Sequence, residues 1–290
     1  MSTLKSNIMP YIQLMRLDRP IGILLLMWPT LWALWMAAKG FPDPTVLIVF
    51  VLGVIIMRSA GCAINDFADR HVDGMVWRTQ GRPLATGDLD AKDAVLLFAV
   101  LAIAAFLLVL MLNALTIRLS VIGVVLAATY PFMKRYTYLP QLYLGLAFGW
   151  AIPMAFAAQT NSLPVIAWLL LLANIIWATV YDTFYAMADR EDDLLAGIKS
   201  TAILFGDDDR TILGILQVTF VIVMILIGQQ LQLGWIYYLS LVIASLLFVY
   251  QQIITRTREP AQCLLAFLNN NWVGAVIFVG LVMDYSFLKP

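Results

Sequence analysis

The sequence has few charged residues for its length. Lys, Arg, Asp and Glu make up 12% of the 290 residues, whereas a soluble domain carries about 25%. Hydrophobic residues make up 62% of the chain, and the mean hydropathy is +0.87. This composition excludes an ordinary soluble domain and predicts a protein that crosses a membrane several times. The formal net charge is zero, which argues against nucleic acid as a partner.

Cysteine and histidine are also scarce. The two cysteines, Cys62 and Cys263, lie in apolar segments, which excludes a disulfide framework and gives no metal-binding spacing. The first ten residues, MSTLKSNIMP, lack the charged-then-apolar order and the cleavage site of a signal peptide. We therefore expect the first apolar segment to be a retained membrane span.

The sequence does contain a series of long apolar segments. A helix needs about 20 apolar residues to cross the hydrocarbon core of a bilayer. We expect nine such helices, which makes the chain a multi-pass membrane protein. The expected spans are residues 21–38, 45–64, 94–112, 115–132, 139–158, 163–185, 211–231, 234–254 and 264–284.

The charged residues that do occur favour one side of the membrane. With nine spans, the N-terminus and the loops after the even-numbered spans share a side, which holds 15 of the 18 Lys and Arg. Only Lys39, Arg118 and Lys289 fall on the other side. This bias predicts a cytoplasmic N-terminus and an outer C-terminus. The same side holds 16 of the 18 Asp and Glu, which the positive-inside rule does not require. A polar site is therefore expected on the cytoplasmic face.

Two acidic triplets follow the second and the sixth expected spans. The first lies in NDFADRHVD (65–73) with spacings of three and four residues, and the second has spacings of seven and four. If each span continues as a helix into its loop, each triplet lies on one helix face. Like charges this close repel each other, so a cation is expected between them. The triplets are Asp66, Asp69 and Asp73, and Asp182, Asp189 and Asp193.

Mg²⁺ is the cation that these triplets predict. It prefers oxygen ligands and is usually bound by a few carboxylates together with substrate phosphates. Basic residues alternate with the acids, and guanidinium groups suit phosphate oxygens. Acids for a metal and bases for oxyanions together predict a site for a metal-bridged diphosphate. These bases are Arg70, Arg78, Arg82, Arg190 and Lys199.

Acidic helix ends near a membrane can also be merely solvated. We interpret the run 207–209 in this way, because the dipole of the seventh span favours acids at its start. Two triplets with helical spacing, both on the same side, are harder to explain by solvation alone.

Several stretches resemble the UbiA family of intramembrane prenyltransferases. NDFADRHVD matches the family's N-D-x-x-D-x-x-x-D motif, and DREDD (189–193) matches its D-x-x-x-D motif. YPFMK (130–134) matches a Y-x-x-x-K pattern, and RLDRPIG and GRPLATG (81–87) are also similar. YAMADREDD together with GIKSTAILFG (197–206) resembles the bacterial branch that acts on 4-hydroxybenzoate in ubiquinone biosynthesis.

The resemblance implies an all-α bundle of nine transmembrane helices in one domain, residues 1–290. Its central cavity would have a cytoplasmic polar cap and a lateral opening to lipid, in a bacterial inner membrane. The implied reaction is Mg²⁺-dependent transfer of a polyprenyl group from polyprenyl diphosphate to 4-hydroxybenzoate. The ring carbon next to the hydroxyl would be prenylated, giving 3-polyprenyl-4-hydroxybenzoate and diphosphate.

Carried onto the matching positions, the resemblance also implies roles for individual residues. The metal-binding residues would be Asp66, Asp69, Asp73, Asp189 and Asp193. The diphosphate would be bound by Asn65, Arg70, Arg78, Arg82, Tyr130, Lys134 and Lys199. Arg135 would bind the acceptor's carboxylate, and Asp182 is our candidate for favouring loss of the phenol or ring proton.

Other polar residues are expected to be structural. His71 is interpreted as solvated, and Arg16 and Arg19 as membrane anchors by default, with a role in the polar cap as the alternative. Asn174 and the run 269–271 are expected to hydrogen-bond between helices.

Two alternatives stay open. A sister prenyltransferase could act on dihydroxynaphthoate, homogentisate or haem, because acceptor choice depends on cavity residues that the sequence does not locate. An ion-coupled transporter is the alternative from another class, since intramembrane acids often relay ions. Relay acids should lie near mid-span, however, whereas these lie at the ends of spans.

Overall fold

The computed structural model describes residues 2–75 and 78–287, with side chains from residue 8 onward except that of Met75. Within these ranges, nine helical segments are long and apolar enough to cross a membrane, as expected. The fold is all-α, and the chain is a multi-pass membrane protein. Of the basic residues used to assign orientation, Lys289 lies outside the described residues, as does the side chain of Lys5.

Some spans are single helices and others are interrupted. The single helices are α2 (Ile21–Ala38), α3 (Pro44–Asp69), α5 (Ala91–Val109), α9 (Val165–Ala188) and α14 (Pro260–Phe287). The interrupted spans are α6 (Ala114–Thr129) with the 3₁₀ turn η2 (Tyr130–Arg135), α7 (Pro140–Gly149) with α8 (Ala151–Thr160), α11 (Thr201–Phe205) with η3 (Gly206–Asp208) and α12 (Asp209–Gln230), and α13 (Trp235–Ile254) with η4 (Thr255–Thr257). The remaining short elements are α1 (Ser2–Leu14), η1 (Asp73–Met75), α4 (Pro83–Thr86) and α10 (Arg190–Leu195).

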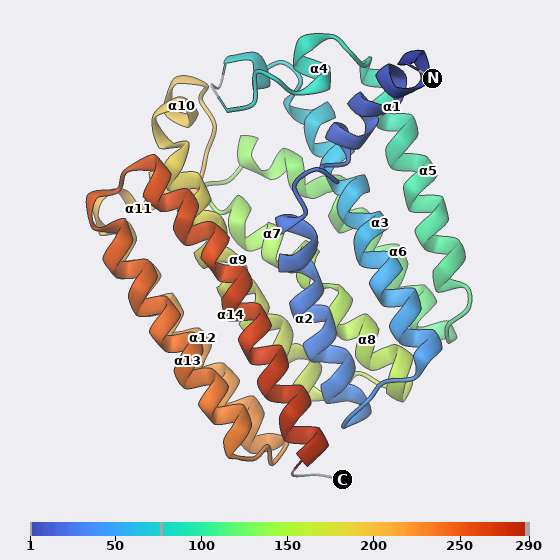
Figure 1. Cartoon of the computed structure of the whole chain (residues 1–290), viewed down its shortest axis with the longest axis vertical. Helices are drawn as coiled ribbons and strands as arrows, with labels where there is room; N and C mark the ends of the chain where they lie inside the picture. Colours follow the sequence, from blue (N-terminus) through green and yellow to red (C-terminus); the bar gives the residue numbers. More distant parts are fainter. Residues whose placement is uncertain (1, 76–77, 288–290) are drawn as a thin grey trace.

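The spans lie side by side as one bundle (Figure 1). The short helices α1, α4 and α10 gather at the end where the N-terminus lies, and the C-terminus is at the opposite end. We call the end that carries these short helices the polar end. Both acidic motifs follow their spans into loops at this end.

Local signals explain where the spans begin. Asp43 caps α3 by accepting hydrogen bonds from the backbone N–H groups of the first turn, which also contains a proline at its first position. Asn113 divides the long apolar stretch after residue 94, as expected, by capping α6 through the N–H of Thr116. The Asn113 amide also donates to the carbonyl of Ala157 at 2.6 Å, which joins α6 to α8.

The core is aromatic where α2, α9 and α12 meet. The Trp32 and Trp177 ring centroids are 5.2 Å apart, and the Trp177 and Phe220 centroids are 6.2 Å apart. The indole N–H of Trp177 donates to the side chain of Asn270 at 2.9 Å, and Asn270 is fully buried. An intramembrane indole needs such a partner because lipid offers none.

The other intramembrane asparagines also join helices, which confirms that expectation. Asn269 accepts a hydrogen bond from Gln251 at 2.9 Å, and Asn271 accepts one from Trp28 at 2.8 Å. Asn174 donates to the carbonyl of Gly145 at 2.9 Å, linking α9 to α7.

Gly145 allows α7 and α9 to approach closely, and its replacement gives a test of this packing. A Cβ atom at Gly145 would lie 2.9 Å from the Cα of Ile175, a backbone atom that cannot yield locally. Gly145→Ala is expected to lower the stability of the detergent-solubilised protein by about 1–3 kcal/mol, as overpacking does in well-packed cores. Thermal unfolding measures this. Gly53→Ala is the control, because a Cβ at Gly53 meets nothing within 4 Å. Equal midpoints for the two variants would contradict the packing argument.

The expectation that each acidic triplet shares one continuous helix is wrong. α3 ends at Asp69, where the side chain of Arg70 donates to the carbonyl of Phe67 at 2.7 Å, and Asp73 lies in the following turn η1. α9 likewise ends at Ala188, one residue before Asp189. Backbone carbonyls at a helix end lack intrahelical partners, and the Arg70 side chain satisfies one of them.

The solvated interpretation of residues 207–209 is only partly right. Asp207 and Asp208 are exposed, but Asp209 is completely buried at the start of α12. Its carboxylate accepts hydrogen bonds from the side chains of Arg190 and Arg258. Burial of a charge requires such partners, which the sequence pattern did not reveal.

Candidate active site

A polar cavity of about 870 Å³ opens at the polar end of the bundle. It is lined by residues of α2, α3, α9 and α14 and of the loops that follow α3 and α9. All six aspartates of the two triplets line it, so the fold brings together acids that are far apart in the sequence. The other predicted site residues that line it are Asn65, Arg78, Arg82, Tyr130, Lys134 and Lys199.

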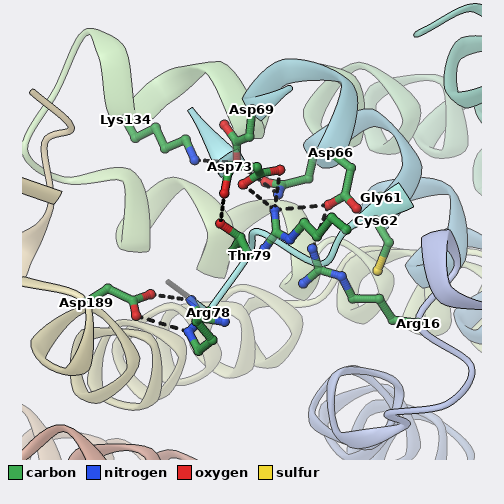
Figure 2. A network of polar contacts seen from close by, with 12 residues as sticks. Arg16, Gly61, Cys62, Asp66, Asp69, Asp73, Arg78, Thr79, Lys134 and Asp189 are labelled. Atoms are coloured by element: carbon green, nitrogen blue, oxygen red, sulfur yellow. Dashed lines mark hydrogen bonds and ion pairs between the residues drawn. The ribbon is translucent and has the colours of Figure 1, made fainter. Parts of the chain in front are cut away.

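Bases surround the first triplet. Asp66 accepts a hydrogen bond from Arg16 at 2.6 Å and lies 3.2 Å from a guanidinium nitrogen of Arg82. The same nitrogen of Arg82 donates to both carboxylate oxygens of Asp73, at 2.8 and 2.9 Å. Figure 2 shows these contacts beside the ion pair between Lys134 and Asp69.

The second triplet faces the same cavity from the other half of the chain. Arg78 donates from Nε to Asp189 at 3.0 Å and from a terminal nitrogen to the other oxygen of Asp189 (Figure 2). Its second terminal nitrogen donates to the Tyr185 hydroxyl. The Arg78 guanidinium also lies 4.2 Å from the centre of the Tyr185 ring. Arg78 thus links the loop after α3 to the end of α9. Among the described residues, none forms a hydrogen bond or ion pair with the Asp182 carboxylate, which lines the cavity within α9.

Asp69 has an oxygen without a partner. Its Oδ2 accepts hydrogen bonds from Lys134 and, at 3.2 Å, from Asn65. Its Oδ1 is buried and has no hydrogen-bond partner among the described residues. A buried carboxylate oxygen without a donor is costly, and a bound cation would satisfy it.

Two acids outside the spans have raised pKa values. Burial raises the pKa of Asp73 to about 6, against the attraction of Arg82 and with repulsion from Asp69 and Asp66. Burial, followed by repulsion from Asp189, raises the pKa of Asp193 to about 7, against Lys134 and Arg78. A cation bound between these carboxylates would stabilise their ionised forms and lower both pKa values.

The residues present fit a divalent metal ion. The donor set is carboxylate oxygen, which suits a hard cation, and the unsatisfied Oδ1 of Asp69 points to a missing ligand. Within the part of the chain that is described, no three acidic, histidine or cysteine side chains are close enough to hold one ion. Asp66, Asp69, Asp73 and Asp189 are each paired with a base instead. Metal binding would therefore require these acids to exchange their basic partners for the ion.

Three predicted bases, Arg70, Arg135 and Arg190, do not line the cavity, and Arg190 pairs with Asp209 instead. Arg70 donates to the Phe67 carbonyl and stacks on the Phe67 ring, which is its role at the helix end. Arg135 is exposed, donates to the carbonyl of Ala68 and lies over the ring of Phe132. Neighbours along the chain point in different directions in the turn η2, so Lys134 reaches the cavity while Arg135 does not.

Lys199 and Tyr130 lie in the cavity wall, and both donate hydrogen bonds to backbone carbonyls. The Lys199 ammonium donates to the carbonyl of Tyr136 at 3.3 Å and lies over the ring of Tyr138. The Tyr130 hydroxyl donates to the carbonyl of Gly61 at 3.3 Å.

Arg16 is a cavity residue, and its interpretation as an anchor is wrong. It has φ +53°, lies in the link between α1 and α2, and pairs with Asp66. Burial lowers the pKa of Arg16, but attraction to Asp66, Cys62 and Tyr185 together with the hydrogen bond to Asp66 outweighs it, so the net shift is upward. Arg16 lies close to α3 because the link between α1 and α2 folds back over the bundle. No local sequence signal predicts this fold of the link.

Arg58 is the residue that the sequence analysis missed. It lies within α3, lines the polar cavity, and has no carboxylate within ion-pair distance among the described residues. Its Nε is buried without a hydrogen-bond partner, and its guanidinium lies 5.8 Å from the centre of the Phe148 ring. A Cβ at Gly22 would lie 2.3 Å from this Nε, so the glycine provides the space for the guanidinium. A charged residue inside an apolar span was the available signal.

A second cavity, apolar and about 410 Å³ in volume, meets the polar cavity beside Arg58. Arg58, Tyr130 and Phe148 line both. The rest of its wall is mostly apolar and comes from α3, α5, α6 and α8, with Val54 and Phe106 among the lining residues. The two cavities together can hold a molecule with a polar head and an apolar chain.

Comparison with known proteins identifies the family. The sequence matches the UbiA prenyltransferase family over residues 26–278. The chain belongs to this family. The resemblance seen in its motifs is confirmed, and the transporter alternative receives no support.

Relatives and solved structures agree with this assignment. The chain is 62% identical over 282 residues to 4-hydroxybenzoate octaprenyltransferase of Nitrosococcus oceani, covering 97% of this chain and 99% of the relative. It is 60% identical over 275 residues to the protein of the same name from Vibrio campbellii, covering 95% and 97%.

The UbiA fold is seen in the solved structures. An apo UbiA homologue from Aeropyrum pernix superposes with a TM-score of 0.80 at 24% identity, covering 90% of this chain and 97% of that one. A homologue from Archaeoglobus fulgidus, bound to DMAPP and Mg²⁺, gives a TM-score of 0.70 at 17% identity, covering 96% and 99%.

Proposed function

We propose that this UbiA-family protein is a 4-hydroxybenzoate polyprenyltransferase that uses Mg²⁺ and forms a single domain over residues 1–290. The observation that carries the proposal is the junction of the two cavities. A cavity with six carboxylates and several bases adjoins an apolar cavity, and between them lies Arg58, which donates to the Cys62 sulfur but has no carboxylate partner among the described residues. The acceptor is proposed from the relatives at about 60% identity, which are named 4-hydroxybenzoate octaprenyltransferase.

The donor would lie across both cavities. Its diphosphate would occupy the polar cavity, and its isoprenoid chain would enter the apolar cavity, where burial of the chain stabilises binding. Asp66, Asp69, Asp73, Asp189 and Asp193 would hold Mg²⁺, which would supply positive charge to stabilise the departing diphosphate.

The bases of the site would bind the leaving group. Arg78, Arg82 and Lys134 pair with the acids in the structure, and each would be released when its acid binds the metal. Their donors can then bind phosphate oxygens while the bond between the allylic carbon and the diphosphate oxygen breaks. We propose supporting roles for Asn65, which orients Asp69, and for Tyr130 and Lys199 in the wall. Arg70 is not retained as a diphosphate ligand because it does not line the cavity.

Arg58 would hold the acceptor. The carboxylate of 4-hydroxybenzoate needs a cation, and among the described residues Arg58 is the arginine of the cavity wall that has no carboxylate partner. This replaces Arg135 as the proposed acceptor ligand. A ring held beside Arg58 lies at the junction of the cavities, where the reacting end of the donor chain would be. The ring carbon next to the hydroxyl forms the new bond and then loses its proton, and Asp182 is proposed to favour that loss.

We also propose that the polar end faces the cytoplasm in a bacterial inner membrane. Support comes from the bias of Lys and Arg toward this end.

An apolar wall around the reacting atoms excludes water, which would otherwise capture the allylic cation as an alcohol.

A membrane assay tests the function. Membranes that contain the protein are incubated with 4-hydroxybenzoate, a long-chain polyprenyl diphosphate and Mg²⁺, and the prenylated acid is quantified. Product is expected with Mg²⁺ and none after thorough chelation, with recovery on re-addition. Dihydroxynaphthoate and homogentisate are offered in parallel. Absence of the 4-hydroxybenzoate product, or product from another acceptor alone, would overturn the proposed acceptor, and product that survives chelation would overturn the metal role.

A further inference from the structure

Asp209 is a buried carboxylate that the proposed reaction does not use. Its side chain has no exposed surface, whereas Asp207 and Asp208 before it are exposed. It is not part of the cavity wall. A buried charge is stable only when it is paired and hydrogen-bonded, so its partners explain its place in the fold.

Its carboxylate joins three segments at the polar end. A guanidinium nitrogen of Arg190, in α10, donates to Oδ2. The Nε of Arg258, in the turn between α13 and α14, donates to both oxygens at 3.0 and 3.2 Å. The backbone N–H of Arg210, in α12 itself, donates to Oδ1 at 2.6 Å. Another nitrogen of Arg258 donates to the carbonyl of Asp207 at 2.7 Å, which fixes Arg258 in turn.

Arg190 connects this carboxylate to the second acidic motif. It follows Asp189 directly, yet Asp189 lines the cavity and pairs with Arg78, whereas Arg190 extends away to Asp209. Successive residues of a helical turn point about 100° apart. Fixing Arg190 therefore fixes the direction of Asp189. The N–H of Asp193 donates to the carbonyl of Asp189 at 2.8 Å, so the same turn also presents Asp193.

The far end of this loop has anchors of its own. The backbone N–H of Lys199 donates to the carbonyl of Lys134 at 3.0 Å. The N–H of Thr201 donates to the side chain of Gln141 at 3.0 Å. Asp209 is therefore the anchor of the part of the loop that carries the motif, while the part that carries Lys199 is held from η2 and α7.

We propose that Asp209, acting through Arg190, is a positioning residue that holds Asp189 and Asp193 in the direction required to bind a metal–diphosphate. The inference rests on the proposed function. It makes Asp209 important for the binding of Mg²⁺ and diphosphate but not for the acceptor, because Arg58 lies on a different helix.

Isothermal titration of the full-length protein in detergent with Mg²⁺ and inorganic diphosphate tests this. Asp209→Asn is expected to weaken binding about tenfold or more, as loss of residues that orient metal ligands does. The KM for 4-hydroxybenzoate should stay within about twofold, since uncoupled sites act independently. Asp207→Asn is the matched control, because it removes the same charge from an exposed position two residues away, and it should bind as the wild type does.

A second variant separates positioning from stability. Arg190→Gln should weaken Mg²⁺–diphosphate binding to the same degree as Asp209→Asn, and the double variant should lose no more than either, because both changes break one connection. If Asp209→Asn does not fold, Arg190→Gln alone decides the question. Lower thermal stability with unchanged binding in the folded variants would overturn the inference while leaving the proposed function intact. A wild type that fails to bind Mg²⁺ and diphosphate would overturn both.

Discussion

Asp69→Asn is expected to lower kcat/KM for prenyl transfer about 1,000-fold while the protein remains folded. The Oδ2 of Asp69 is paired with Lys134, and its buried Oδ1 has no hydrogen-bond donor among the described residues. Asp69 is therefore the acid of the site whose free oxygen is best placed to bind a cation. Asparagine keeps the size but lacks the charge, and it places an N–H₂ group or a weaker acceptor toward the ion. Loss of preorganised electrostatic stabilisation of this kind costs about 10²–10³ in rate for a single donor, and a direct metal ligand should be at the upper end.

The measurement is product formation at several Mg²⁺ concentrations, together with thermal unfolding and gel filtration in detergent. Glu191→Gln is the control, because Glu191 is exposed and lies inside the same acidic DREDD stretch that supplies Asp189 and Asp193. It removes one negative charge near the site without removing a cavity residue. Activity of Asp69→Asn within tenfold of the Glu191→Gln control would show that Asp69 is not a metal ligand and would remove the central argument for the metal site.

Arg58→Gln is expected to lower kcat/KM for 4-hydroxybenzoate about 100-fold, because truncating one partner of a buried charge pair costs about 2–5 kcal/mol. The reason is the position of Arg58. It is half-buried at the junction of the two cavities, its buried Nε has no hydrogen-bond partner among the described residues, and Gly22 leaves room for it. An anionic acceptor supplies the missing counter-charge. The metal and diphosphate ligands are on other side chains, so donor binding should change little.

The decisive readout is discrimination between 4-hydroxybenzoate and its methyl ester, since a ratio of rates does not depend on the fraction of active protein. The wild type should prefer the free acid strongly, and Arg58→Gln should lose this preference. Arg58→Lys should restore part of it because the charge is kept. Arg135→Gln, the change at the position that the motif pattern favoured, should leave the ratio unchanged. An Arg58→Gln variant that retains the wild-type ratio would show that another residue binds the acceptor carboxylate.

Arg135 and Arg58 show which site residues could be predicted from the sequence and which could not. Arg135 was predicted from its place beside Lys134, but in a 3₁₀ turn neighbouring side chains diverge, and Arg135 contacts the carbonyl of Ala68 instead of the cavity. Arg58 belongs to no motif and lies inside the apolar segment 45–64. Its proposed role depends on the two cavities meeting beside it. The walls at this junction include residues of α6, α7 and α8, which are far from Arg58 in the sequence.

The number of spans, the family and the shared side of the charged residues could be predicted from the amino-acid sequence alone. These properties follow from local composition, because each apolar segment gains free energy from the bilayer independently of its neighbours and each motif is contiguous. Which acidic side chain pairs with which basic side chain depends on the tertiary structure. Arg16 pairs with Asp66 across 50 residues, and Arg78 meets Asp189 across 111. Such partners depend on how helices pack after insertion, and on where a helix ends, which is why the anchoring of α10 by Asp209 could not be inferred from spacing alone.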